Sequence, residues 1–164
     1  MSFDIFLQCY RKGLPTSFKR EVFEDMFLAH CDNRKEYRSD PKFMRVKYPD
    51  DSRADIYIGT VHEVRSLMLE LGNVAEANAL SSDLGDPRDI LDLMFNHCGG
   101  DMFFETMYKL ADRTQSVIFW PNVPSLIVVT NEAVLKELEP DFPGIDNPRI
   151  VHSGADIVEA IRNS

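Results

Sequence analysis

The chain has 164 residues, of which 44% are hydrophobic and 27% are charged. This length favours one domain with one hydrophobic core, and the composition excludes a wholly disordered chain. Acidic residues outnumber basic residues by 27 to 18, which gives a formal net charge of −9 and disfavours a protein whose main task is to bind nucleic-acid phosphates.

The charge is unevenly distributed along the chain. Residues 1–60 carry 11 basic and 10 acidic side chains, whereas residues 61–164 carry 7 basic and 17 acidic ones. An acidic surface attracts a basic partner, although excess acid also serves solubility. We therefore expect the acidic part of the chain to contact a basic protein partner, and four carboxylates are candidates for this contact: Asp83, Asp86, Asp89 and Asp92.

No stretch of the sequence resembles a membrane-spanning helix, because prolines divide the longest uncharged run, residues 114–131. Polar residues interrupt the N-terminus too early for the apolar region of a signal peptide, which predicts a cytoplasmic protein. Cys9, Cys31 and Cys98 are odd in number and form no C-x-x-C pair. We expect them to be free thiols that pack as small apolar side chains.

The first 60 residues predict the order β-α-β-β. Alternating apolar and polar residues indicate a strand at the N-terminus. Thr16 or Ser17 can then cap a helix whose Phe and Val residues recur at helical spacing, and a Pro-Asp turn between two β-rich runs indicates a hairpin. The expected strand, helix, loop and paired strands lie at residues 3–10, 17–29, 30–41, 43–48 and 54–58.

The same order returns after residues 61–89, which we interpret as a connector or insertion with one short helix ended by Gly72. Asp101 occupies the position of a helix cap in the second set. Its strand, helix and paired strands are expected at residues 90–96, 101–113, 115–120 and 125–129. The repeated order suggests two β-α-β-β units, residues 3–59 and 90–129, and both duplication and coincidence are open explanations.

The C-terminal residues predict a helix at 131–138, a loop at 140–148 and a last helix. Ser153 caps this last helix, and Asp156 completes a capping box. Single helices that alternate with paired strands are typical of an α+β domain. We therefore expect one domain over residues 1–164, with a mainly antiparallel or mixed sheet and helices packed mostly on one face.

Three segments resemble a group of small, uncharacterised bacterial proteins. They are the opening MSFDIFLQ (1–8), the segment LMFNHCGGD (93–101) and the run IFWP (118–121). The resemblance spans most of the chain except residues 61–89, which look like an insertion relative to shorter members. It implies a bacterial cytoplasmic protein, and it implies no activity and no catalytic residue.

The densest cluster of chemically active residues is His97, Cys98, Gly99, Gly100 and Asp101. A helix that begins near Asp101 presents free N–H groups, which lower the pKa of a nearby thiol and attract an anion. This arrangement is compatible with an anion site at Gly99, Gly100 and Asp101 and with Cys98 as a nucleophile. Adjacent side chains on a strand point to opposite faces, so His97 is poorly placed as its base. Alternatively, Gly99 and Gly100 form the turn, Asp101 caps the helix, and His97 and Cys98 serve only as packing residues.

The sequence also contains side chains that can bind zinc and a single tryptophan near the end of a strand. The side chains that zinc prefers are His30, Cys31, His62, His97, Cys98 and His152. None of their pairs has the spacing of two to five residues that zinc sites usually show, so no metal site is predicted. No phosphate loop or other cofactor motif is present, so no cofactor is predicted. Trp120 ends a strand, where it anchors a partner or closes the edge of the core.

The leading hypothesis is a non-enzymatic, acidic cytoplasmic binding or accessory protein, for example of the immunity type, that occupies a basic protein partner. Neither nucleic acid nor a membrane is an expected partner, and the oligomeric state is open. The alternative is a small enzyme with a thiol or anion site at residues 97–101. Convergent polar groups around Cys98 would favour the enzyme, whereas a flat acidic surface would favour the binding protein.

Overall fold

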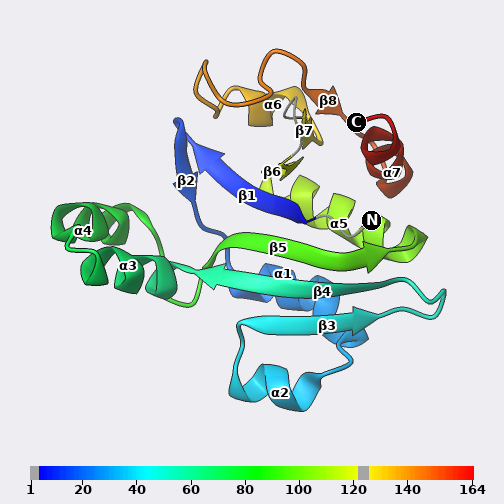
Figure 1. Cartoon of the computed structure of the whole chain (residues 1–164), viewed down its shortest axis with the longest axis horizontal. Coiled ribbons are helices and arrows are strands. Elements are labelled where there is room, and N and C mark those ends of the chain that lie inside the picture. Colours follow the sequence, from blue (N-terminus) through cyan, green and yellow to red (C-terminus); the bar gives the residue numbers. More distant parts are fainter. Residues whose placement is uncertain (1–3, 122–125) are drawn as a thin grey trace.

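The computed structural model describes residues 4–121 and 126–164, without the side chains of residues 79–83. One sheet contains the strands β1 (Ile5–Arg11), β2 (Leu14–Thr16), β3 (Phe43–Lys47), β4 (Arg53–Thr60), β5 (Ile90–Gly99), β6 (Ser116–Trp120), β7 (Leu126–Val129) and β8 (Arg149–Ile150). The helices are α1 (Arg20–Phe27), the 3-10 helix η1 (Leu28–His30), α2 (Arg34–Ser39), α3 (Val61–Glu70), α4 (Val74–Asp83), α5 (Asp101–Thr114), α6 (Glu132–Leu135) and α7 (Gly154–Arg162) (Figure 1).

The sheet is mixed and mostly antiparallel, which confirms the predicted α+β fold. Its strand order is β3-β4-β5-β1-β6-β7-β8. The short strand β2 lies outside this order and pairs with the last three residues of β1. Among the strand pairs of the described residues, only β7 and β8 run parallel. Helix α5 connects β5 to β6, and these two strands flank β1. Helix α1, followed by η1 and α2, instead leads from β2 to the edge strand β3.

The two predicted units are alike in part. Helices α1 and α5 lie on the same face, where the rings of Phe27 and Phe103 are 6.5 Å apart, and β1 and β5 are antiparallel neighbours. The hairpins differ, because β4, the second strand of its hairpin, lies next to β5, whereas β6, the first strand of its hairpin, lies next to β1. The strand order therefore differs between the two units, because one strand lies between β5 and β6 but two lie between β1 and β3. An origin by duplication stays a prediction.

The main core lies between the sheet and helices α1, α5 and α7. On β1, Ile5, Leu7 and Cys9 face this core and alternate with half-buried residues, as the period of two predicts. Four buried phenylalanines fill the space under the helices: Phe23, Phe27, Phe95 and Phe103. A second apolar cluster, which includes Val134 of α6, covers the opposite face over β6, β7 and Tyr10 near the end of β1.

Several local predictions need correction. Residues 30–41 contain α2 rather than a continuous loop, because Tyr37 is buried and its hydroxyl donates a hydrogen bond to Glu24 of α1 (2.7 Å). Residues 61–89 contain two helices rather than one. The first, α3, begins with a capping box between Thr60, which is the last residue of β4, and Glu63. Ser153 caps α7, as predicted.

The outer edge of β3 is covered by residues of the preceding loop. The Asp32 N–H donates to the Arg45 carbonyl (2.8 Å), and the Arg45 N–H donates to the Asn33 side chain (2.8 Å). These bonds satisfy main-chain groups that an edge strand would otherwise present to solvent. None of the helices in the described ranges has the length and apolar character needed to cross a membrane.

Candidate functional site

The segment around His97 forms a bulge on β5. The pairing of β4 with β5 shifts register between Arg53 and Asp55, and His97 has a left-handed backbone with φ +46°. The bulge directs His97 toward Asp55, and a hydrogen bond of 3.1 Å joins Nδ1 to Oδ2. Bulges and left-handed non-glycine residues are frequent near functional sites. The surroundings of His97 are therefore a candidate functional site.

The carboxylate of Asp55 also accepts a hydrogen bond from Arg45 Nε (3.1 Å). The resulting chain, Arg45, Asp55 and His97, borders a groove of about 950 Å³. A carboxylate that orients an imidazole is typical of acid–base sites. The charges of the groove balance, however, because its charged lining consists of three basic and three acidic residues: Arg45, Lys47, Arg53, Asp32, Asp51 and Asp55. This balance is typical of a solvated surface.

Cys98 is half-buried and borders a smaller pocket of about 340 Å³ together with Ser52 and His97. Burial raises the pKa of the Cys98 thiol to about 11, and the charge of Asp4 adds to the rise. A nucleophilic cysteine needs the opposite shift, because the thiolate is the reactive form. The environment of Cys98 therefore supports a packing role better than a catalytic one.

We expect Cys98 in the folded protein to react slowly with iodoacetamide at pH 7. A pKa of about 11 leaves about 300-fold less thiolate than an ordinary thiol has, and the rate should rise about tenfold per pH unit up to that pKa. Peptide mass spectrometry after timed alkylation at several pH values measures this rate, with the urea-unfolded chain as control. A rate at pH 7 above that of the unfolded chain would instead identify an activated nucleophile.

The N-terminus of α5 is already occupied by a carboxylate of the same chain. The helix begins at Asp101, so Gly100 rather than Asp101 is its N-cap residue, because β5 continues to Gly99. The N–H of Met102 donates to Asp50 Oδ2 (3.1 Å), which comes from the turn between β3 and β4. An external anion predicted at Gly99, Gly100 and Asp101 would have to compete with this carboxylate.

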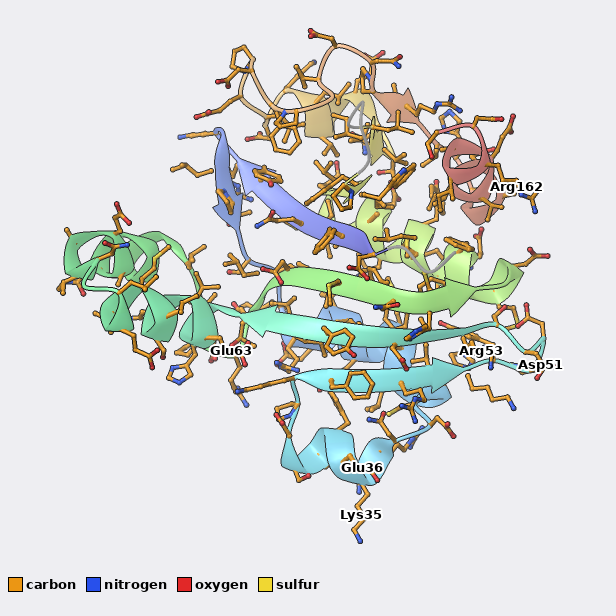
Figure 2. All side chains as sticks on the ribbon, in the orientation of Figure 1. Lys35, Glu36, Asp51, Arg53, Glu63 and Arg162 are labelled. Atoms are coloured by element: carbon orange, nitrogen blue, oxygen red, sulfur yellow. The ribbon has the colours of Figure 1, made fainter. Side chains whose placement is uncertain are left out.

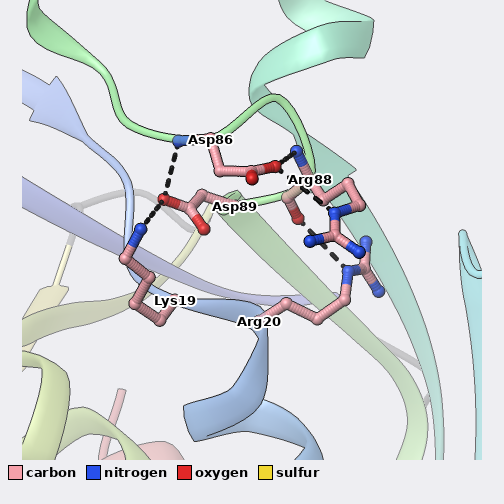
Figure 3. A network of polar contacts seen from close by, with 5 residues as sticks. All are labelled: Lys19, Arg20, Asp86, Arg88 and Asp89. Atoms are coloured by element: carbon pink, nitrogen blue, oxygen red, sulfur yellow. Dashed lines mark hydrogen bonds and ion pairs between the residues drawn. The ribbon is translucent and has the colours of Figure 1, made fainter.

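The predicted acidic binding residues do not form one exposed surface (Figure 3). Asp89 is only 4% exposed, because its carboxylate accepts hydrogen bonds from Lys19 Nζ and the Asp86 N–H, each 3.1 Å long. Asp86 is exposed and pairs with Arg88 (3.4 Å), whose carbonyl accepts a hydrogen bond from Arg20. The interactions tie this loop to the start of α1, so Asp89 has a structural role and is not available to a partner.

The other predicted contact residues are also dispersed. Asp92 is half-buried on the solvent side of β5, where burial and then the charge of Glu63 raise its pKa. The side chain of Asp83 lies outside the described residues. Trp120 is 1% exposed and belongs to the core beneath the sheet, so it cannot anchor a partner. Within the described ranges, no group of His, Cys, Asp and Glu is arranged to hold a metal ion.

A surface that the sequence analysis overlooked lies on α3 and α4, which together form the arm (residues 61–83). The arm projects from the ends of β4 and β5 (Figure 1). Val61 at its base is buried, whereas Leu67, Leu71 and Val74 near its tip are 56%, 68% and 52% exposed. The helical spacing of these residues can be read from the sequence. That no other part of the described chain packs over them cannot be read from the sequence, because it depends on tertiary contacts.

Comparisons with known proteins identify no related protein. No family model matches the chain, and no curated protein or solved structure is significantly similar to it.

Proposed function

We propose that the protein is a non-enzymatic cytoplasmic binding protein that occupies a basic protein partner through the tip of the arm. The observation that carries this proposal is the exposed apolar group formed by Leu67, Leu71 and Val74. A contiguous group of large apolar side chains on a projecting element is typical of a protein contact surface. An amphipathic helix of the partner can pack along this stripe.

The charge of the arm specifies the chemistry of the partner. Residues 61–83 carry four acidic side chains and one basic side chain. Glu70 and Glu76 are exposed and flank the apolar residues in sequence, so lysines or arginines of a partner can lie beside them. Such charges accelerate association and disfavour acidic partners. A small acidic protein that covers a basic surface fits an accessory or immunity-type role.

The enzyme alternative has weaker support. The raised thiol pKa of Cys98 and the carboxylate of Asp50 at the start of α5 both act against a reactive thiol beside an anion site. The groove at His97 has balanced charges. The arm, in contrast, combines exposed apolar residues with an excess of acidic side chains, and both features are useful to a binding protein.

A synthetic amphipathic helix of Leu and Lys tests the proposal. We expect it to shift the backbone amide signals of the arm, and we expect the double variant Leu67→Ser/Leu71→Ser to weaken its affinity by about tenfold or more. Reversal of charge in Glu70→Lys/Glu76→Lys should lower the association rate and reduce its dependence on salt. Titration by NMR and stopped-flow fluorescence measure the two effects.

Leu14 provides the matched control, because it is 62% exposed and lies away from the arm on β2. The variant Leu14→Ser should leave the affinity unchanged, and a peptide of Leu and Glu should bind poorly. A protein that co-purifies from the native host supports the proposal only if it is basic and loses affinity for the same arm variants. Equal losses in the Leu14 and arm variants would contradict a specific site.

A further inference from the structure

We infer that the uncovered face of the sheet, across β3, β4, β5 and β1, is the contact between two copies of this chain in a symmetric dimer. The core helices α1, α5 and α7 pack on the opposite face, and the cluster with α6 covers β6, β7 and Tyr10 near the end of β1. Figure 1 views this uncovered face, with α1 behind the strands. This contact is independent of the arm.

A row of apolar side chains crosses the uncovered face from strand to strand. Its members are cross-strand partners in register: Phe43, Tyr57, Met94 and Phe6. Phe119 of β6 continues the row but packs against the cluster with α6. The rings of Phe43 and Tyr57 are 5.0 Å apart, and those of Phe6 and Phe119 are stacked at 5.5 Å. Tyr57 is 43% exposed. The solvated face of an antiparallel sheet normally carries polar residues, so an apolar row indicates a second layer.

The charges on either side of this row identify that layer as a second copy. Toward the β3–β4 turn, Arg53 is exposed and forms no ion pair among the described residues, whereas Asp55 and Asp51 neutralise their basic neighbours. Beyond the other end of β4, Glu63 pairs with Lys42, and Asp92 has no ion-pair partner within the described ranges. Figure 2 shows Arg53 and Glu63 at opposite ends of β4.

A two-fold axis parallel to the apolar row satisfies both features at once. It places the row of one copy on the row of the other, and it reverses the strand direction, so the basic end of each copy faces the acidic end of its partner. The interface is then self-complementary in shape and charge. Single-stranded nucleic acid also stacks on aromatic rows, but a chain with net charge −9 and an acidic end on this face favours a second copy.

Sedimentation equilibrium of the full chain at micromolar concentrations tests the inference. We expect a species of twice the chain mass of 18.8 kDa. Tyr57→Lys, at the middle of the row, should weaken dimerisation about tenfold or more. Arg53→Glu should also weaken it, and the double variant Arg53→Glu/Asp92→Lys, which exchanges the two ends, should restore it. Circular dichroism establishes that each variant is folded.

Two further variants make the result specific. Leu71→Lys, at the tip of the arm, should leave the dimer intact, so the failure of this contact and the failure of the arm as a docking site are distinguishable. Tyr57→Cys should be cross-linked between copies by a bismaleimide with a span of about 10 Å, because the axis places this position opposite its counterpart across two sheets packed about 10 Å apart. A monomer at all concentrations, a dimer that only Leu71→Lys dissociates, or a monomer that binds an oligouridine through Tyr57 would each overturn the inference.

Discussion

A Gly100→Ala variant should lose about 3 kcal/mol or more of its free energy of unfolding. Gly100 has φ +96° and ψ 157°, a region that is essentially restricted to glycine. A Cβ atom at this position would lie 2.7 Å from the Cα of Ser52. Because the contact is with backbone, the β3–β4 turn would have to move, and the hydrogen bond from Met102 to Asp50 would be disturbed.

Gly99 is the matched control for this substitution. A Cβ atom there meets no atom within 4 Å, and its φ lies outside the left-handed region. Gly99→Ala should therefore change the stability by less than about 1 kcal/mol in either direction. Urea unfolding followed by circular dichroism measures both variants, and equal losses in the two would show that the turn geometry is not the cause.

An Asp89→Ala variant should be destabilised by about 2 kcal/mol. The buried carboxylate accepts the Asp86 N–H and pairs with Lys19, and its removal takes the acceptor from this part-buried N–H group. The exposed Lys19 ammonium regains water, which limits the loss. The variant should also loosen the loop between the arm and β5, and amide hydrogen exchange at Asp86 and its neighbours reports this change.

Asp86→Ala is the appropriate comparison, because Asp86 is exposed and its pair with Arg88 is worth less than about 1 kcal/mol. Thermal unfolding of the two variants side by side separates the structural carboxylate from the solvated one. If Asp89→Ala kept full stability but weakened binding of a basic partner, Asp89 would act as a surface residue, as the sequence analysis predicted.

Much of the fold could be predicted because its signals are local. The alternation over β1, the turn between β3 and β4 and the cap at Ser153 each depend on a few neighbouring residues, and each prediction agrees with the structure. Helix α2 escaped prediction because it depends on the burial of Tyr37 against Glu24 and Arg20 of α1. Such a contact leaves no periodic pattern within a polar run of six residues.

The candidate sites were less predictable than the fold. Asp55 and His97 are 42 residues apart in the chain, and Asp50 and Met102 are 52 residues apart. Neither contact can therefore be predicted from the spacing of residues in the sequence. Carboxylate content alone could not separate the buried Asp89 from the exposed Asp86. In the arm, only one short helix ended by Gly72 was predicted, and the arrangement of the chain in space determines which of its apolar residues stay uncovered.

The loop that covers the outer edge of β3 has a consequence for the protein at high concentration. An uncovered edge strand can recruit further strands and so seed open-ended β aggregates. Asp32 and Asn33 already use the main-chain groups of Arg45 on that side, and at the opposite edge β8 offers only two residues. Fibril growth by strand addition is therefore disfavoured at both edges of the sheet, and the protein can reach high concentration without templated polymerisation.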